Sequence, residues 1–308
     1  MIEIFKQVNG KLKQVDKPSA GCWINVESPN EADVNMIKGM VDFEDDDVFT
    51  DLKDVDELAR TEKYDDFVFI IFRLPYKAKL KETLSYYTFP LGIIIHEDYL
   101  ITISYFDNEI IKGLKAKKIN PGKKIRATLT VLYISAKTYL RYLKEIRQRT
   151  SDIQKDLETS LKNEELIQLL SLENSLVYFS TSINSNAIMI ERMTKNKIFM
   201  KFADDRELLE DVALETKQAA TVAKIYSDIL SGTMDAFASV ISNNLNIVMK
   251  FLTTTTIILM IPTLIASVYG MNVVLPFEDS PNAFVFVAVI TILATLFGIF
   301  VFWKKRYF

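Results

Sequence analysis

The chain has 308 residues, 49% of them hydrophobic, and a formal net charge of −3. A length of this order allows one large domain or two small ones, and the single cysteine, Cys22, excludes an internal disulfide and is typical of a reducing compartment. All but four of the 37 Lys and Arg and all but two of the 40 Asp and Glu precede residue 247. We therefore expect a water-soluble part followed by a membrane part, and the start MIEIFKQVNG shows no signal peptide.

The water-soluble part opens with strand signals. IEIFKQ, CWINVE and DFVFIIFRL are rich in β-branched and aromatic residues and predict strands, with Cys22 as a buried strand residue. FPLGIIIHEDYLITIS predicts a hairpin that turns at His96. Ser28 to Glu31 reads as a capping box with proline at the first helical position and predicts a helix through about Val41.

These elements predict an α/β cytoplasmic domain over residues 1–122. It ends near the lysine-rich segment KAKKINPGKK, which is either a solvated loop or a contact with lipid headgroups. Helix is expected to dominate from about Ile125, because no proline follows until Pro262. Residues 123–204 predict a cytoplasmic helical hairpin region.

A long stalk helix is predicted over residues 205–269. It starts at Asp204-Asp205, acids that suit a helix N-terminus, and continues into the membrane; the part 205–267 would be roughly 95 Å long. Steps of three and four residues define one heptad series on it, which predicts lengthwise packing against neighbours. Its members are Leu209, Val212, Thr216, Ala219, Ala223, Tyr226, Leu230, Thr233, Phe237 and Val240.

Two uncharged segments predict membrane spans. The first runs from Phe251 to Tyr269, and the second, residues 283–303, is about 31 Å of helix and long enough to cross a bilayer. A buried core helix is the alternative, but two such segments adjoin at the C-terminus. The loop 270–282 has no Lys or Arg, whereas the tail 304–308 is basic, so the positive-inside rule places both termini in the cytoplasm. We expect a multi-pass protein of the cytoplasmic membrane.

A second heptad series on the stalk helix is polar and contains no Leu, Ile, Val, Phe or Tyr. Its members are Asp235, Ser239, Ser242, Asn246, Met249, Thr253, Thr256, Met260, Thr263 and Ser267. Unsatisfied polar groups in contact with lipid are costly. The series therefore predicts either a small-residue contact between helices or a water-filled channel lined by this face. Two spans cannot enclose a pore, so a pore requires an oligomer.

The chemistry of this series indicates the class of ion. Neutral oxygens suit a hard cation that keeps its water, as Mg²⁺ does. His96 and Cys22 are the only His and Cys residues, so no soft-metal site is expected. Acids near both mouths, Asp235 on one side and Glu278 and Asp279 on the other, disfavour anions.

The motif Tyr269-Gly270-Met271-Asn272, at the end of the first span, resembles the signature of the CorA family of divalent-cation channels. The likeness extends over NNLNIVMKFLTTTTIILMIPTLIASVYGMN and the tail WKKR. It implies an α/β cytoplasmic domain, long coiled-coil-like helices and two C-terminal transmembrane helices in a funnel-shaped homopentamer. It also implies transport of Mg²⁺, with Co²⁺ or Ni²⁺ as further ions.

The resemblance also implies roles for individual residues. Gly270, Met271 and Asn272 form the outer selectivity site for a hydrated ion, and Glu278 or Asp279 adds charge there, although the segment VVLPFED departs from the proline–acid order of many relatives. Met249, with Asn246 and Leu252, forms a hydrophobic gate. The implied pore-lining residues are Asp235, Asn246, Met249, Leu252, Thr253, Thr256, Met260, Thr263 and Ser267.

The family likeness further implies inhibitory Mg²⁺ sites between cytoplasmic subunits, so that cytoplasmic Mg²⁺ gates the channel. The acidic run from Asp42 to Glu57 offers one half, with Asp51 as the partner suggested by spacing, and Asp211 on the long helix offers the other. A solvated acidic face is the alternative for this run.

Two other classes of function are alternatives to transport. A two-span membrane anchor for a cytoplasmic sensor or scaffold explains the two spans and the first heptad series, but not the polar series. An enzyme is not expected, because no phosphate-binding glycine loop, nucleophile–base pair or metal-ligand spacing is found. The expected partners are further copies of the chain and membrane lipid; no nucleic acid and no other protein is implied.

Overall fold

The computed structural model describes residues 1–42, 47–80, 83–115, 119–159, 163–273, 275–276 and 281–305. The chain divides into two compact units, Met1–Gly232 and Thr233–Phe308. The described residues form seven helices: α1 (Glu31–Val41), α2 (Asp47–Asp51), α3 (Glu109–Lys115), α4 (Lys124–Thr159), α5 (Asn163–Thr194), α6 (Ala203–Tyr269) and α7 (Ala283–Lys304). The fold class expected from the sequence is confirmed: an α/β N-terminal part, long helices and two apolar C-terminal helices.

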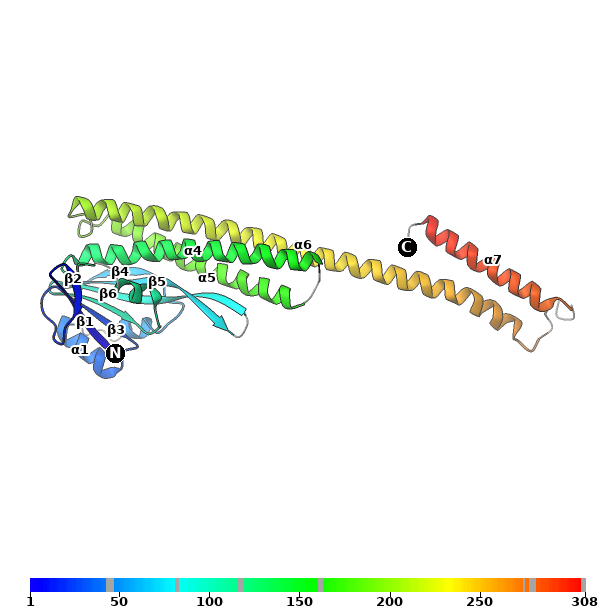
Figure 1. Cartoon of the computed structure of the whole chain (residues 1–308), viewed down its shortest axis with the longest axis horizontal. Coiled ribbons are helices and arrows are strands. Elements are labelled where there is room, and N and C mark those ends of the chain that lie inside the picture. The colour runs from blue at the N-terminus through cyan, green and yellow to red at the C-terminus, as the bar shows by residue number, and fades with distance from the viewer. Residues whose placement is uncertain are drawn as a thin grey trace. The chain divides into compact units, whose positions relative to one another are not determined.

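A seven-stranded mixed sheet lies at the centre of the first unit (Figure 1). Its strands are β1 (Ile2–Val8), β2 (Lys11–Gln14), β3 (Cys22–Glu27), β4 (Arg60–Lys63), β5 (Phe67–Leu80), β6 (Thr83–His96) and β7 (Tyr99–Ser104). Their order is β2-β1-β3-β7-β6-β5-β4, in which β3 and β7 are parallel and the other neighbours antiparallel. The hairpin predicted around His96 is formed by β6 and β7.

Both faces of the sheet are buried. In β5, Ile70 and Phe72 join a core cluster with residues of α3, α4, α5 and α6, whereas Phe69 and Ile71 join a second cluster with residues of α1 and α2. Successive side chains of a strand point to opposite faces, so a continuous apolar run is the expected sequence of a strand covered on both sides. Cys22 is buried in the second cluster, as predicted.

The start of α1 corrects the predicted cap. Asn30 is the N-cap rather than Ser28: its side-chain oxygen accepts from the N–H of Asp33 (2.8 Å), and the Asp33 carboxylate accepts from the N–H of Asn30 (3.2 Å). Ser28 has a positive φ of 45° and lies before the helix, so Pro29 precedes the cap and is not the first helical residue. Ser and Asn are equivalent N-caps by propensity, and the carboxylate at Asp33 selects Asn30.

Four short elements were not predicted: β2, β4, α2 and α3. β2 (KLKQ) and β4 (RTEK) are polar edge strands of four residues, and α2 has five. Elements of this length show too few repeats of the strand or helix period to be recognised from their own residues. Pairing with β1 and β5 holds the two strands in place.

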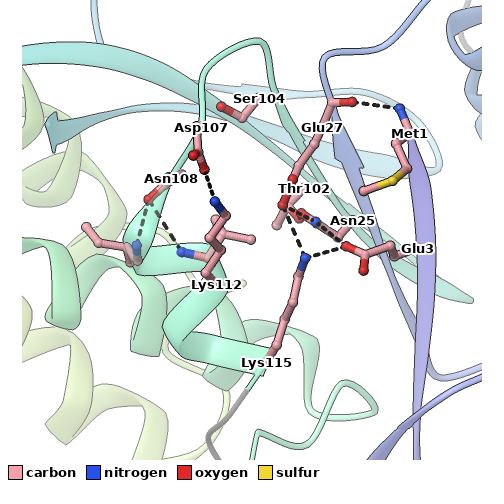
Figure 2. A network of polar contacts seen from close by, with 12 residues as sticks. Met1, Glu3, Asn25, Glu27, Thr102, Ser104, Asp107, Asn108, Lys112 and Lys115 are labelled. Atoms are coloured by element: carbon pink, nitrogen blue, oxygen red, sulfur yellow. Dashed lines mark hydrogen bonds and ion pairs between the residues drawn. The ribbon is translucent and has the colours of Figure 1, made fainter. Parts of the chain in front are cut away.

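A polar network attaches α3 to the sheet (Figure 2). The Lys115 ammonium contacts the carboxylates of Glu3 and Glu27, and the Asn25 amide donates to both acids (3.4 and 3.0 Å). Thr102 extends the network into the core by donating to Asn25 (2.9 Å). Partial burial by itself would lower the pKa of Lys115, but the hydrogen bonds to Glu3 and Glu27 and their charges raise that pKa above its usual value.

The first heptad series is buried where α6 belongs to the first unit. Leu209, Val212, Ala219 and Leu230 are at most 1% exposed, and the first two join the core cluster that holds α4 and α5. Polar contacts between α4 and α6 flank this seam: Arg126 bonds Asp204, and Lys137 bonds Glu215. The predicted lengthwise packing is therefore present along this part of α6.

The second unit contains the end of α6 and helix α7. Both helices are long and apolar enough to cross a membrane, and their most apolar windows are only 6% buried. This low burial is not that of a core helix in a soluble protein. α7 returns alongside α6 (Figure 1), and a Cβ atom added at Gly298 would lie 2.7 Å from Cδ1 of Ile261. The missing side chain at Gly298 thus permits close contact between the two helices.

Candidate pore-lining face of the long helix

The ten residues of the polar heptad series all lie on α6, and all ten are exposed: Asp235, Ser239, Ser242, Asn246, Met249, Thr253, Thr256, Met260, Thr263 and Ser267. We call them the polar stripe. Met249 and Met260 are 52% and 62% exposed. Nothing in the described part of the chain covers this face.

The opposite face of α6 is the one that α7 covers. In the span, the positions with reduced exposure are Thr254, Thr255, Ile258, Ile261, Pro262, Ile265 and Tyr269. Thr254 is 1% exposed, and Ile261 is the residue that contacts Gly298. At 3.6 residues per turn, the centre of this set and the centre of the polar stripe lie roughly 180° apart around the helix. The polar stripe therefore points away from the second helix.

The hydroxyl groups of the stripe are oriented by backbone carbonyls one turn earlier. Thr256 donates to the carbonyl of Leu252 (2.8 Å), Thr263 to that of Leu259 (3.0 Å), and Ser239 to that of Asp235 (3.0 Å). Each hydroxyl has one hydrogen to donate and two lone pairs that accept. Because the hydrogen is already used, these oxygens present acceptors to the outside. Water molecules around a cation point their hydrogens outward, so this surface matches a hydrated cation.

Directly on the N-terminal side of Thr254, α6 is exposed on all sides. Residues 238–253 are exposed at every position, and they include large apolar side chains such as Leu245 (62%), Val248 (60%) and Leu252 (57%). The predicted gate residues Asn246, Met249 and Leu252 belong to this segment. Large apolar side chains that are exposed on several faces of a helix require a partner or lipid, and within one chain the described residues provide none here.

The Tyr-Gly-Met-Asn motif forms the end of α6 and the turn after it. Tyr269 is the last helical residue, and the N–H groups of Gly270 and Met271 still bond to carbonyls of the last turn, those of Ala266 (2.9 Å) and Val268 (3.3 Å). Asn272 follows and is exposed. The predicted loop acids Glu278 and Asp279 lie outside the described residues. The motif thus places an exposed amide just beyond the end of the polar stripe.

The two residues predicted for a regulatory ion site, Asp51 and Asp211, have different surroundings. Asp51 accepts a hydrogen bond from Arg60 (2.5 Å), whose guanidinium also contacts Glu57 and Glu62. Asp211 is exposed on α6. Burial alone would lower the pKa of Arg60, but hydrogen bonds to Asp51 and Glu62 raise it above its usual value. Within one copy, the described residues contain no group of three or more His, Cys, Asp or Glu that could hold a metal ion.

Three residues that contribute to the predicted sites were not singled out from the sequence. Gly298 and Thr254 lie at the α6–α7 contact, and Arg60 pairs with Asp51 and two further acids. A glycine inside an otherwise bulky span is a sequence signal for close helix contact. Glu57 and Glu62 lie within three residues of Arg60, but Asp51 lies on α2 and its contact with Arg60 leaves no comparable signal in the sequence.

Comparisons with known proteins agree with this architecture. The sequence matches the family described as CorA-like Mg²⁺ transporter protein over residues 19–306. It is 25% identical over 291 residues to the cobalt/magnesium transport protein CorA of Methanocaldococcus jannaschii, covering 91% of this chain and 89% of that protein. It is 24% identical over 233 residues to the magnesium transport protein CorA of Helicobacter pylori, covering 73% and 72%.

A solved structure shares the fold over the whole chain. The complete structure of the CorA magnesium transporter from Methanocaldococcus jannaschii aligns with a TM-score of 0.84 and 22% identity, covering 100% of this chain and 99% of that one. The backbone arrangement is therefore common to both chains, although fewer than one residue in four is the same.

Proposed function

The chain belongs to the family of CorA-like Mg²⁺ transporter proteins, and we propose that it is a channel for hydrated divalent cations. The transported ion is Mg²⁺ foremost, with Co²⁺ and Ni²⁺ as further substrates; cobalt and magnesium are the ions named for the Methanocaldococcus jannaschii relative. The observation that carries this proposal is the polar stripe, exposed on the face of α6 opposite α7.

An oligomer follows from the placement of the stripe. Two helices per chain cannot surround a pore, and polar groups in contact with lipid would be left unsatisfied. Several copies arranged around an axis would direct their stripes to a shared, water-filled centre, with α7 on the outside toward lipid. We assign a homopentamer with a funnel-shaped cytoplasmic part, the arrangement implied by the family resemblance. Within it, residues 1–122, 123–204 and 205–269 form the α/β domain, the helical hairpin and the pore-lining stalk.

Selection of the ion is assigned to the outer mouth. A ring of Asn272 amides, on the turn that Gly270 and Met271 begin, offers oxygens that accept hydrogen bonds from the water around Mg²⁺. Mg²⁺ loses its water reluctantly, so a ring that holds the hydrated ion avoids that cost. Glu278 and Asp279 would raise the local cation concentration through Coulomb attraction.

Gating is assigned to the segment that is exposed all round. Several copies of Met249 and Leu252 around an axis form an apolar constriction, and such constrictions close by losing water. Asp235, nearer the cytoplasmic end of the stripe, contributes a negative ring. Cytoplasmic Mg²⁺ closes the gate by bridging acids of neighbouring subunits, Asp211 on one side and Asp51 on the other.

The contact between Arg60 and Asp51 adds a condition to that regulation. The guanidinium already bonds to Asp51, so a divalent cation at Asp51 must displace Arg60 or share the carboxylate with it. The side chains of this ion cluster are about one-quarter to one-third exposed, so a cation from solution can reach the Asp51 carboxylate. Mg²⁺ that binds the closed form more tightly than the open form would then shift the equilibrium toward the closed form.

We assign the protein to the cytoplasmic membrane, with both termini in the cytoplasm. Cysteine introduced at Asn282 should react with a membrane-impermeant thiol reagent from outside, whereas cysteine at the exposed Lys13 should react only after permeabilisation. The native Cys22 is fully buried and contributes no background. Labelling of Lys13→Cys in intact cells would contradict the assigned orientation.

Ion flux into liposomes that contain the purified chain tests the function. We expect uptake of Mg²⁺, Co²⁺ and Ni²⁺ that depends on protein and is absent from empty liposomes, with Zn²⁺ compared in parallel. Light scattering after size-exclusion chromatography establishes that the reconstituted protein is oligomeric. An assembled oligomer without flux of any of these ions would favour the alternative function, a two-span anchored sensor or scaffold.

A further inference from the structure

The first unit contains a cavity of about 700 Å³ that the proposed channel does not use. It lies where the β4–β5 turn and the β6–β7 turn meet the starts of α4 and α6. Cavities of about 300–1,000 Å³ are typical of small-molecule sites.

One wall of the cavity is basic. Lys123, Lys124 and Arg126 come from the start of α4, and Lys201 comes from the turn before α6. Arg126 is paired with Asp204 (3.1 Å), and Lys124 donates to the backbone carbonyl of Glu97 (2.5 Å). Lys123 and Lys201 are exposed and form no ion pair with any residue that the structure describes.

The start of α4 adds to the positive field of this wall. A helix N-terminus carries a partial positive charge and favours acids, as α6 shows with Asp204 and Asp205 in its first turn. The first turn of α4 has no acid. Cations of three segments, including Lys63 of β4, thus line one cavity together with a helix N-terminus whose own first turn contains no acid.

The wall formed by the two turns carries three acids, and it meets the basic wall where Lys124 bonds to Glu97. Asp65 and Asp66 lie in the β4–β5 turn, and Glu97 lies in the β6–β7 turn. All three are exposed. A free anion held on the basic wall would be repelled by these carboxylates, whereas an anion that carries its own divalent cation would be attracted by both walls.

The floor of the cavity is apolar and offers an aromatic ring. Val68, Ile95 and Ile125 line it and belong to the main core cluster or pack against it. Phe202 is 58% exposed at the edge, although most large aromatic residues of this unit are buried. The Lys201 ammonium lies over this ring, 5.8 Å from its centroid, so a heterocyclic base would stack on the other face.

We propose that this cavity binds a nucleoside triphosphate with its Mg²⁺. Its phosphates contact Lys123, Lys201 and the start of α4, its Mg²⁺ is held through water near Asp65 and Asp66, and its base stacks on Phe202. The ligand matches the two oppositely charged walls and the apolar floor together, which a free phosphate or a neutral metabolite does not. The site lies within one copy, so it does not depend on the channel or on its oligomeric state.

Isothermal titration calorimetry of the full-length protein in detergent with MgATP tests the proposal. The concentration of free Mg²⁺ is kept equal in the cell and the syringe. We expect one saturable site per chain. Lys123→Gln with Lys201→Gln should weaken it about tenfold or more, since two charge-assisted contacts are lost. Lys11→Gln with Lys13→Gln, which removes two exposed lysines of β2 outside the cavity, should leave the affinity unchanged. Magnesium tripolyphosphate tests the base: Phe202→Leu should weaken MgATP binding but not the binding of tripolyphosphate.

The acidic wall gives an independent test. Asp65→Asn with Asp66→Asn should reduce the preference for MgATP over ATP measured in excess EDTA. Absence of saturable MgATP binding, or equal affinity in the cavity variants and the β2 control, would overturn the proposal. Binding is measured without flux, so either this site or the channel can fail without the other.

Discussion

The pair of substitutions Thr256→Val and Thr263→Val tests the polar stripe directly. Valine has nearly the same shape as threonine and lacks the hydroxyl oxygen that each residue presents after donating to the carbonyl one turn earlier. A hydrogen bond of this kind contributes about 1 kcal/mol net. If a permeating hydrated ion contacts two hydroxyls of a threonine ring at once, replacing that ring with valine raises the barrier to permeation by about 2 kcal/mol. This increase corresponds to a roughly 30-fold lower flux per ring.

Flux of Mg²⁺ into liposomes measures this loss, and the oligomer is checked by light scattering. Thr291 and Thr295 of α7 provide the matched control, because their hydroxyls also donate to carbonyls one turn earlier (both 2.8 Å) but do not belong to the stripe. Valine at these two positions should leave flux within about twofold of the parent, since the pore loses no acceptor. The thermal stability of both double variants should be similar, because neither substitution removes a contact between residues distant in sequence.

Two results would refute the reasoning. Parental flux in a correctly assembled Thr256→Val, Thr263→Val protein would mean that these oxygens do not face the ion path. An equal loss in the α7 control would mean that the effect comes from the helices and not from the pore surface.

Three further predictions concern the mouth, the gate and regulation. Asn272→Ala removes the amide ring, so the protein should assemble but conduct Mg²⁺ at least about tenfold more slowly; parental flux would remove the selectivity role. Met249→Ser makes the constriction wettable, so flux should become less sensitive to internal Mg²⁺ than in Val248→Ser, a change on a neighbouring face; unchanged sensitivity would place the gate elsewhere. Asp211→Asn should shift inhibition of flux to higher Mg²⁺, whereas Glu210→Gln, beside it and also exposed, should not; coincident inhibition curves would exclude Asp211 from the regulatory site.

Arg60 connects the acidic run to the fold. Its guanidinium joins Asp51 at the end of α2 to Glu62 of β4, and Glu57 lies between them in sequence. One guanidinium offsets only part of the charge of these three carboxylates, and Asp54 and Asp56 of the same run remain exposed. The acidic run therefore combines a structural ion cluster with exposed acids, and the sequence pattern does not separate the two.

Much of the architecture follows from the sequence, because secondary structure and helix faces depend on local spacing. The 3.6-residue period of a helix decides which residues share a face, so the apolar seam at Leu209 and the polar stripe at Thr256 could both be read in advance. Apolar runs of β-branched residues, such as the one in β5, likewise predict strands buried on both faces. Charge depletion over 31 Å of helix predicts a membrane span for the same reason: the signal lies in consecutive residues.

The tertiary structure decided what depends on residues distant in sequence. Only the packing of Gly298 against Ile261 shows which face of α6 is covered and which is free. Arg73, in an apolar strand, can be buried because acceptors from the α2–β4 loop and from α5 reach its guanidinium, the Glu57 carbonyl (2.7 Å) and the Ser182 hydroxyl (3.2 Å). The cavity at the start of α4 likewise exists only where two turns and two helices meet. Spacing along the chain does not encode such contacts, because each one joins residues whose separation in sequence bears no relation to their distance in space.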